Sequence, residues 1–402
     1  MSASRVRERS LRRLTGEQKE AMGKLKRSRG SAEPGLFGAI STSTAIDRVG
    51  FNRDRLLTAL GEAFAEEDLI DLRKSVAVIK SCLESSGADE RGLISYEADW
   101  DVVWFSREVF STELDQIVQA RTIERARYYL KRLARGVEGI KNGKINEINL
   151  FRWKEYGDII TDSLWMLPRR DTSGAHLGWY WGNFIPQIPH QMMLRYTKRG
   201  DWVLDPFAGS GTTLIECRRL GRNGIGIELN GEVVAKSRVL VETEPNPRSA
   251  STEILAGDSR SLDIPGALEK RGIDNVQLLI LHPPYSDIIR FSDDDADLSG
   301  SKDTDQFLAM FGEVLDNVVP ALERGRYCAL VAGDKYHKGQ WIPLGFYCMN
   351  EVLKRGLVLK STIVKNFDDT RAKRDQKQLW RYRALVGGFY VFKHEYVFVF
   401  RK

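Results

Sequence analysis

The chain has 402 residues, a length that favours two domains over one, and 42% of its residues are hydrophobic, which is enough for a sizeable core. This composition excludes a wholly disordered chain, and no apolar run approaches the roughly 18 residues that a membrane helix needs. The net charge of +6 favours a polyanionic partner only weakly, because net charge describes a field rather than a fold.

The four cysteines are widely spaced and none belongs to a C-x-x-C pair, a pattern that argues against a zinc site and against a secreted disulfide scaffold. The basic N-terminus lacks the apolar stretch of a secretory signal. We therefore expect reduced thiols, no metal, no membrane segment and a cytoplasmic location.

Two segments precede the region that carries motifs. Residues 1–35 are rich in Arg, Lys, Ser and Gly, which predicts a basic flexible arm. Contact with DNA phosphates and a solvated tail without a role are equally compatible with this arm. Residues 36–150 are expected to form a helical N-terminal domain, because apolar residues recur with helical period, for example at Leu56, Leu60 and Phe64.

From residue 151 to residue 402, short apolar runs alternate with helical segments. Short apolar runs separated by helices predict an α/β fold with a mainly parallel sheet and helices on both faces. In such sheets the ligand lies at the carboxyl ends of the strands. The predicted strands are Asp201–Asp205, Gly224–Glu228, Val276–Leu281, Tyr327–Ala332 and Tyr396–Phe400.

A glycine-rich turn follows the first of these strands. Residues 202–213 read W-V-L-D-P-F-A-G-S-G-T-T, which predicts a strand, a tight turn and the start of a helix that ends before Gly221. Glycines allow a sharp turn and the close approach of a ligand, and the free amides of a helix N-terminus suit a carboxylate. Asp205 can accept a hydrogen bond from a cationic amine.

Two acidic residues follow the turn. Glu228 ends the second strand about 20 residues later, where a carboxylate suits the hydroxyl pair of a ribose. Asp258 follows a third strand and can accept a hydrogen bond from an adenine amine. Either acid alone is more often a surface residue or a helix cap, so the interpretation depends on their order and spacing.

The strand at 276–281 runs into His282, Pro283, Pro284 and Tyr285. Prolines cannot continue a sheet ladder, so the carbonyls around them stay free to accept from an amino group. Enzymes that modify a base take it out of the duplex and hold it against flat side chains, and the Tyr285 ring can stack on a base in this way. In isolation, this tetrapeptide would be an ordinary strand followed by a turn.

Together, D-P-F-x-G-S-G-T-T and H-P-P-Y resemble the motifs of the DNA amino-methyltransferases, which methylate adenine N6 or cytosine N4 with S-adenosylmethionine. The resemblance implies a Rossmann-like class I methyltransferase fold for this part of the chain. The family's tetrapeptide begins with Asp, Asn or Ser, and His282 stands there instead. A neutral imidazole can still accept one hydrogen bond from the base amine, whereas a protonated one cannot.

The resemblance also implies a set of site residues. The implied catalytic residues are His282, Pro283, Pro284 and Tyr285. The segment before the glycine turn resembles one that closes over the methionine end of the cofactor, although core packing explains its aromatic residues equally well. The implied cofactor-binding residues are Asp205, Phe207, Gly209, Ser210, Gly211, Thr212, Glu228, Asp258, Asn183 and Phe184.

Basic residues interleaved with aromatic ones occur near the C-terminal end of this region. The pattern fits phosphate contact combined with stacking better than it fits a solvated loop. The expected DNA-binding residues are Arg371, Lys373, Arg374, Lys377 and Arg381. Upstream, residues 286–301, which include the acidic residues 293–295 and Asp297, form either a loop near the base pocket or simply a solvated segment.

These motifs lead us to expect a site-specific DNA methyltransferase that transfers a methyl group directly to an exocyclic base amine after base flipping. As the target amine, we expect cytosine N4 slightly ahead of adenine N6. The expected partner is double-stranded DNA, with or without a cognate restriction endonuclease. Two alternatives stay open: a methyltransferase for RNA guanine N2 or protein glutamine, and a non-catalytic nucleic-acid-binding relative, which His282 motivates.

Overall fold

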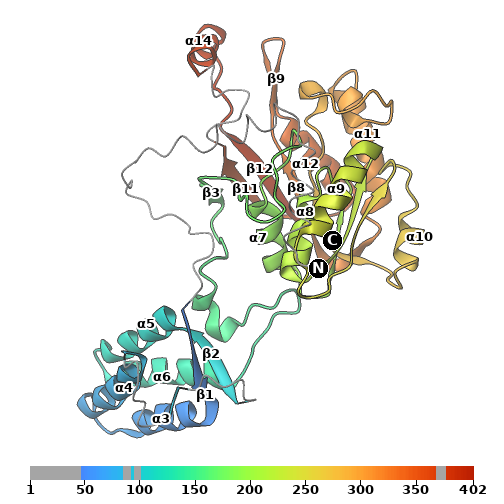
Figure 1. The fold of residues 1–402 in the computed structure, drawn as a ribbon. Coiled ribbons are helices and arrows are strands. Elements are labelled where there is room, and N and C mark those ends of the chain that lie inside the picture. Colours follow the sequence, from blue (N-terminus) through green and yellow to red (C-terminus); the bar gives the residue numbers. More distant parts are fainter. Residues whose placement is uncertain (1–46, 85–91, 95–100, 368–376) are drawn as a thin grey trace, which may run out of the picture. The chain divides into compact units, whose positions relative to one another are not determined.

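The computed structural model describes residues 47–84, 92–94, 101–367 and 377–402 (Figure 1). The arm expected over residues 1–35 lies outside them, as do the expected DNA-binding residues Arg371, Lys373 and Arg374. Within the described ranges, no helix has both the length and the apolar character needed to cross a membrane. The four cysteines are free and buried.

Helices dominate the part of the chain before residue 150. A two-stranded antiparallel ribbon of β1 (Arg48–Asn52) and β2 (Val102–Ser106) accompanies them, which the helical pattern alone did not predict. The helices are α3 (Arg53–Ala65), α4 (Leu69–Glu84), α5 (Arg107–Val118) and α6 (Ile123–Glu138), followed by the short helix η1 (Leu150–Glu155).

Polar side chains fix where these helices begin. The side chains of Asn52, Ser106 and Thr122 accept hydrogen bonds from backbone amides in the first turns of α3, α5 and α6. Such caps satisfy amides that have no partner within the helix. Inside, the rings of Phe51 and Phe110 lie 4.5 Å apart in a hydrophobic cluster whose buried residues run from 49 to 137. The domain division at residue 150 stays a prediction.

An eight-stranded sheet forms the second part of the chain, in the order β3-β11-β12-β8-β7-β4-β5-β6. Only β12 runs antiparallel to its neighbours, and it lies between β8 and β11. A mainly parallel sheet of this kind confirms the predicted Rossmann-like α/β fold. The strands are β3 (Leu164–Trp165), β4 (Trp202–Asp205), β5 (Asn223–Glu228), β6 (Thr252–Ala256), β7 (Val276–Leu281), β8 (Leu322–Ala332), β11 (Val358–Asn366) and β12 (His394–Arg401).

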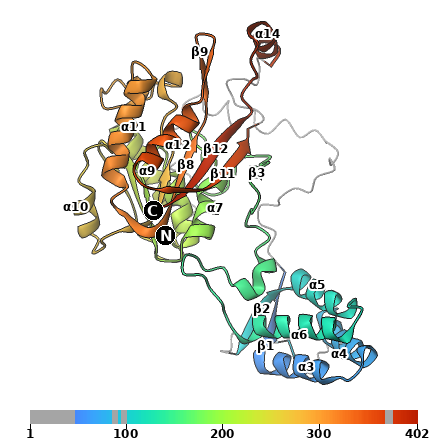
Figure 2. The ribbon, with the colours of Figure 1, turned by 180° about the vertical axis from the view of Figure 1, so that it is seen from behind.

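Helices cover both faces of the sheet, which explains why its central strands are apolar throughout. Along β7, Leu278 and Ile280 pack on one face, in the cluster of α7 (Gln187–Tyr196) and α8 (Thr212–Leu220). Leu279 and Leu281 pack on the other face, in the cluster of α11 (Thr304–Val318) and α12 (Leu344–Lys354). The elements are labelled in two opposite views (Figures 1 and 2). One face carries α7, α8 and α9 (Gly231–Thr243); the other carries α10 (Ile264–Glu269), α11 and α12.

Smaller elements follow the carboxyl ends of the strands. After β7 come the short helices η2 (Ser286–Ile288) and η3 (Leu298–Gly300), and after β8 comes a hairpin of β9 (Lys335–His337) and β10 (Gln340–Ile342). The chain re-enters the described residues with α14 (Lys377–Gly387). The rings of Tyr336 and Phe389 stack at 4.2 Å, which connects the segment after α14 to the hairpin.

Candidate functional site

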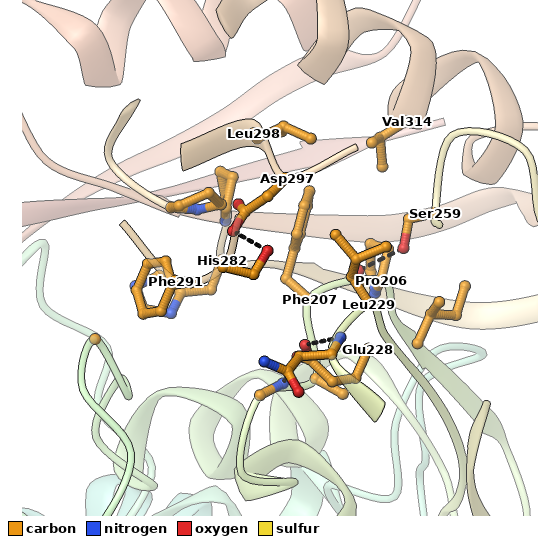
Figure 3. A pocket seen from close by; sticks show the side chains of 18 of the residues that line it. Pro206, Phe207, Glu228, Leu229, Ser259, His282, Phe291, Asp297, Leu298 and Val314 are labelled. Atoms are coloured by element: carbon orange, nitrogen blue, oxygen red, sulfur yellow. Dashed lines mark hydrogen bonds between the residues drawn. The ribbon is translucent and has the colours of Figure 1, made fainter. Parts of the chain in front are cut away.

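A pocket lies at the carboxyl ends of β4, β5, β6 and β7, where parallel sheets place their ligands. Two further segments complete its wall: the stretch before α7 around Asn183, and the loop after β7 from Ile288 to Leu298. Figure 3 shows Phe207, Glu228, His282, Phe291 and Asp297 around this space.

The glycine turn after β4 takes a backbone shape that other residues rarely adopt. Gly209 and Gly211 have φ values of 50° and 79°, and Gly211 caps the start of α8. A Cβ on Gly211 would lie 2.6 Å from Cγ2 of Val241. Glycine is therefore required here both by conformation and by space. Gly221, with a φ of 71°, ends α8 as predicted.

Asp205 holds this turn together from inside the protein. Its carboxylate accepts hydrogen bonds from the Thr213 hydroxyl at 2.5 Å and from the Phe207 amide at 2.9 Å. Asp205 is fully buried, and burial raises its pKa to about 6. It does not line the pocket, and neither do Ser210, Gly211 and Thr212. The expected contact of Asp205 with a cofactor amine stays a prediction.

The remaining predicted cofactor-binding residues do line the pocket: Phe207, Gly209, Glu228, Asp258, Asn183 and Phe184. The Glu228 carboxylate accepts from the backbone amides of Gly209 at 3.0 Å and Asn230 at 2.9 Å, and burial raises its pKa. Asp258 is paired with Arg260, whose Nη2 lies 2.9 Å from Oδ2. Both carboxylates are thus held in place by the protein before any ligand binds.

Among the pocket residues that sequence reasoning did not single out are Tyr180 and Asp297. Tyr180 lines the pocket and stacks on Phe291, with ring centroids 5.6 Å apart. Asp297, part of the acidic segment, is 8% exposed and accepts hydrogen bonds from the Ser292 hydroxyl and the Ser299 amide. Residues between Ile288 and Leu298 therefore form part of the pocket wall, and the expectation that this loop lies near a base stays a prediction. Only the D-x-S pattern of a local turn signalled Asp297.

All four residues of the tetrapeptide, His282 to Tyr285, line the same pocket. The His282 ring lies 4.8 Å from the Phe184 ring and 5.7 Å from the Tyr285 ring, which is edge-on to it. Burial lowers the pKa of His282 to about 4. The imidazole is therefore neutral near pH 7, and one of its two ring nitrogens can accept a hydrogen bond.

A buried ion pair stands behind Tyr285. The Tyr285 hydroxyl donates to Oε2 of Glu395 at 3.0 Å, and Lys365 Nζ donates to Oε1 of the same carboxylate at 2.8 Å. Lys365 and Glu395 face each other across β11 and β12. Burial works to raise the pKa of Glu395. The charge of Lys365, acting together with His282 and the hydrogen bonds from Lys365 and Tyr285, outweighs burial, so the pKa lies below its usual range. No sequence motif signals this pair.

A second polar cluster lies beside α8, away from the pocket lining. The Glu216 carboxylate lies 2.6 Å from Nε2 of His176 and 2.7 Å from Nδ1 of His190. Burial opposes ionisation, yet these two hydrogen bonds lower the pKa of Glu216 to about 2. Asp171, His176 and Glu216 have the ligand types of a metal site. Arg219 already supplies positive charge there, 3.1 Å from Asp171 and 3.3 Å from Glu216.

Two of the predicted DNA-binding residues fall within the described chain. Lys377 is the first residue of α14, and Arg381 is exposed on the same helix. Arg381 does not line the pocket. Their contact with DNA stays a prediction.

Residues 105–238 match the model of a family described as DNA methylase. The chain is 47% identical over 51 residues to the type II methyltransferase M.MjaII of Methanocaldococcus jannaschii, which covers 13% of this chain and 10% of that protein. It is 47% identical over 58 residues to M2.DpnII of Streptococcus pneumoniae, covering 14% and 22%. The similarity to M.Cfr9I of Citrobacter freundii is 39% over 72 residues, covering 18% and 23%. The chain thus spans less than a quarter of these relatives.

The chain is also similar to solved structures. TrmN from Thermus thermophilus matches with a TM-score of 0.34 and 16% identity, covering 55% of this chain and 49% of that one. Aeropyrum pernix fibrillarin, solved with natively bound S-adenosyl-L-methionine, matches with a TM-score of 0.30 and 15% identity, covering 50% and 67%.

Proposed function

We propose that this chain methylates an exocyclic base amine in double-stranded DNA, because residues 105–238 match the DNA methylase family model and short stretches are similar to type II methyltransferases. Cytosine N4 is the preferred target over adenine N6. The observation that carries the proposal is that the glycine turn and the tetrapeptide His282–Tyr285 line one pocket, although they are far apart in the sequence.

The family's cofactor is S-adenosylmethionine, and the residues of the pocket fit it. Glu228 is a carboxylate anchored by two backbone amides beside the glycine turn, which suits the ribose hydroxyls. Asp258 suits the adenine amine, and the rings of Phe207 and Tyr180 offer flat apolar surfaces. When bound, this cofactor supplies an electrophilic methyl group.

The role of His282 follows from its neutral state. An imidazole nitrogen accepts a hydrogen bond from one N–H of the target amine and so increases electron density on the amine nitrogen. Tyr285, whose hydroxyl is tied to Glu395, presents its ring to a base rotated out of the duplex. Catalysis then rests on positioning of the amine for in-line attack, with no covalent bond to the protein.

The wider assignments are parts of the same proposal. Residues 151–402 would form the catalytic domain, 36–150 a helical domain and 1–35 a basic arm. Arg371, Lys373, Arg374, Lys377 and Arg381 would contact DNA phosphates, and a cognate restriction endonuclease is the expected functional partner. The cytoplasmic location also stays a prediction.

One alternative of a different class has a specific observation behind it. His282 replaces the Asp, Asn or Ser of the family's tetrapeptide, so a relative that binds nucleic acid without transferring a methyl group is the competing function. A methyltransferase for RNA guanine N2 or protein glutamine is the competing enzyme, and the same assay separates all three.

The test is methyl transfer from tritiated S-adenosylmethionine to mixed-sequence duplex DNA, total RNA and a protein extract, followed by identification of the labelled product. We expect N4-methylcytosine in DNA, with N6-methyladenine as the second choice. His282→Asn, which restores a family residue, should stay active, whereas His282→Ala should lose most activity. Label confined to RNA or protein would refute the proposal, and cofactor binding without any label would favour the non-catalytic alternative.

A further inference from the structure

Helix α6 has two faces of different character. Ala126, Leu130, Leu133 and Val137 are buried against the other helices. The opposite side carries the exposed cations Arg125, Lys131 and Arg135, and Arg121 is exposed just before the helix begins. We call these four residues the α6 basic face. A helix that buries one stripe normally exposes polar residues opposite, so exposure alone does not indicate a binding surface.

These four cations have no acidic partner among the described residues. In the same part of the chain, ion pairs join Lys74 to Asp71, Lys80 to Asp115 and Arg132 to Glu113. Arg107 also pairs with Asp47. By contrast, no carboxylate among the described residues lies within ion-pair distance of the α6 basic face.

The positive charge of α6 is local. Residues 47–138 hold 14 Lys and Arg against 18 Asp and Glu, a net charge of −4 (14 − 18). Helix α6 alone holds five cations against two carboxylates, a net charge of +3 (5 − 2). The carboxylate of Glu124 lies in its first turn, where the helix dipole favours negative charge. A segment of negative net charge thus concentrates positive charge on one helix.

Aromatic rings hold part of the face in position. The Arg125 guanidinium lies 5.4 Å from the Tyr128 ring and 4.9 Å from the Tyr129 ring, and its Nε donates to the Tyr129 hydroxyl at 2.9 Å. Tyr128 is 57% exposed. A guanidinium that is already ordered loses less conformational entropy when it binds an anion.

The spacing of the cations suits an extended polyanion. Arg125 and Arg135 are ten residues apart, so about 15 Å of helix axis separates them. Duplex DNA carries one phosphate charge per about 1.7 Å of its axis, so a row of this length faces several phosphates. A single small anion would contact only one end of the row.

We propose that the α6 basic face binds the phosphate backbone of duplex DNA without reading its sequence. This inference rests on the proposed function, since it assumes that DNA is the substrate. The face would increase the affinity for DNA and lower the KM for DNA, while the chemistry stays at the pocket. It also gives the helical domain, which carries no catalytic motif, a role in the reaction.

The test compares the full chain with the variant Arg125→Gln/Lys131→Gln/Arg135→Gln. Binding of a labelled duplex is measured by fluorescence anisotropy over a series of KCl concentrations, without cofactor. Loss of three phosphate contacts should reduce the slope of log K against log salt by about 2 to 3 and weaken binding at least tenfold at low salt. The kcat at saturating DNA should not change, because none of the three residues lines the pocket.

A matched control removes the same charge elsewhere. The exposed residues Lys270, Arg324 and Lys360 lie near the amino ends of β7, β8 and β11, whereas the pocket lies at the carboxyl ends of the strands. Their triple Gln variant should keep the wild-type salt slope. Equal slopes for the α6 variant and the wild type would refute the inference, as would equal losses in both variants. Wild-type protein that binds duplex through α6 but methylates no DNA would refute only the proposed function.

Discussion

The buried ion pair behind the tetrapeptide should dominate the stability of the catalytic site. Lys365→Met removes the cation and leaves the Glu395 carboxylate buried, with a side chain only 11% exposed. Breaking a buried ion pair by removing one partner costs about 3 to 5 kcal/mol. For a domain of about 150 to 250 residues, each kcal/mol lowers Tm by about 2 to 4 °C, so we expect a decrease of about 6 to 20 °C.

A second variant separates lost charge from lost packing. Lys365→Met/Glu395→Gln leaves an amide oxygen that can still accept the Tyr285 hydroxyl, and it leaves no unpaired charge in the interior. Its Tm should therefore recover at least half of the loss. Both melts are followed by circular dichroism at pH 7.5 without cofactor. A Lys365→Met variant that melts within about 2 °C of the wild type would refute the reasoning, because such a result contradicts a buried, coupled pair.

Three further outcomes follow from the site. Because burial lowers the pKa of His282 to about 4, titration of this group should leave kcat/KM for methyl transfer constant from pH 6 to pH 8. The value of kcat/KM should fall only as His282 becomes protonated near pH 4. An inflection near pH 6.5 that His282→Asn removes would contradict this expectation. Gly211→Ala places a Cβ at a φ of 79° and 2.6 Å from Val241, so the free energy of unfolding should fall by about 1 to 3 kcal/mol in denaturant titrations, and an unchanged midpoint would oppose it. Tyr180→Ala removes the ring that stacks on Phe291, so calorimetry should find weaker cofactor binding, whereas Kd values equal to the wild type would exclude Tyr180 from the site.

The sequence predicted those parts of the fold that depend on short-range patterns. The apolar run of β7 is buried on both faces, so its composition alone indicated a central strand. The turn between β4 and α8 needs glycine for conformational reasons, so Gly209 and Gly211 marked it. Because parallel strands end at one edge of a sheet, the motifs after β4 and β7 could be expected to meet.

Features that depend on long-range pairing were not predicted. Strand β11 reads V-L-K-S-T-I-V-K-N, in which polar residues interrupt the apolar run, so it did not stand out as a strand. Lys365 meets Glu395 only through the register of β11 and β12, which no local pattern reveals. The same holds for His176 and Glu216, which are 40 residues apart and meet in the interior. The helical pattern expected over residues 36–150 also did not reveal the break before Thr122, where a capping side chain starts α6.

The antiparallel insertion of β12 has a consequence for the order in which the protein can assemble. During synthesis, β12 leaves the ribosome after the other seven strands of the sheet, yet it separates β11 from β8. Until it arrives, β8 and β11 have no common partner, and each exposes a free edge. Glu395 arrives on the same strand, so the Tyr285 hydroxyl gains its acceptor in the final step of sheet closure. A nascent chain that already holds the glycine turn and the tetrapeptide would therefore still lack the carboxylate that holds the Tyr285 hydroxyl, and the proposed methyl transfer would wait until translation has passed β12.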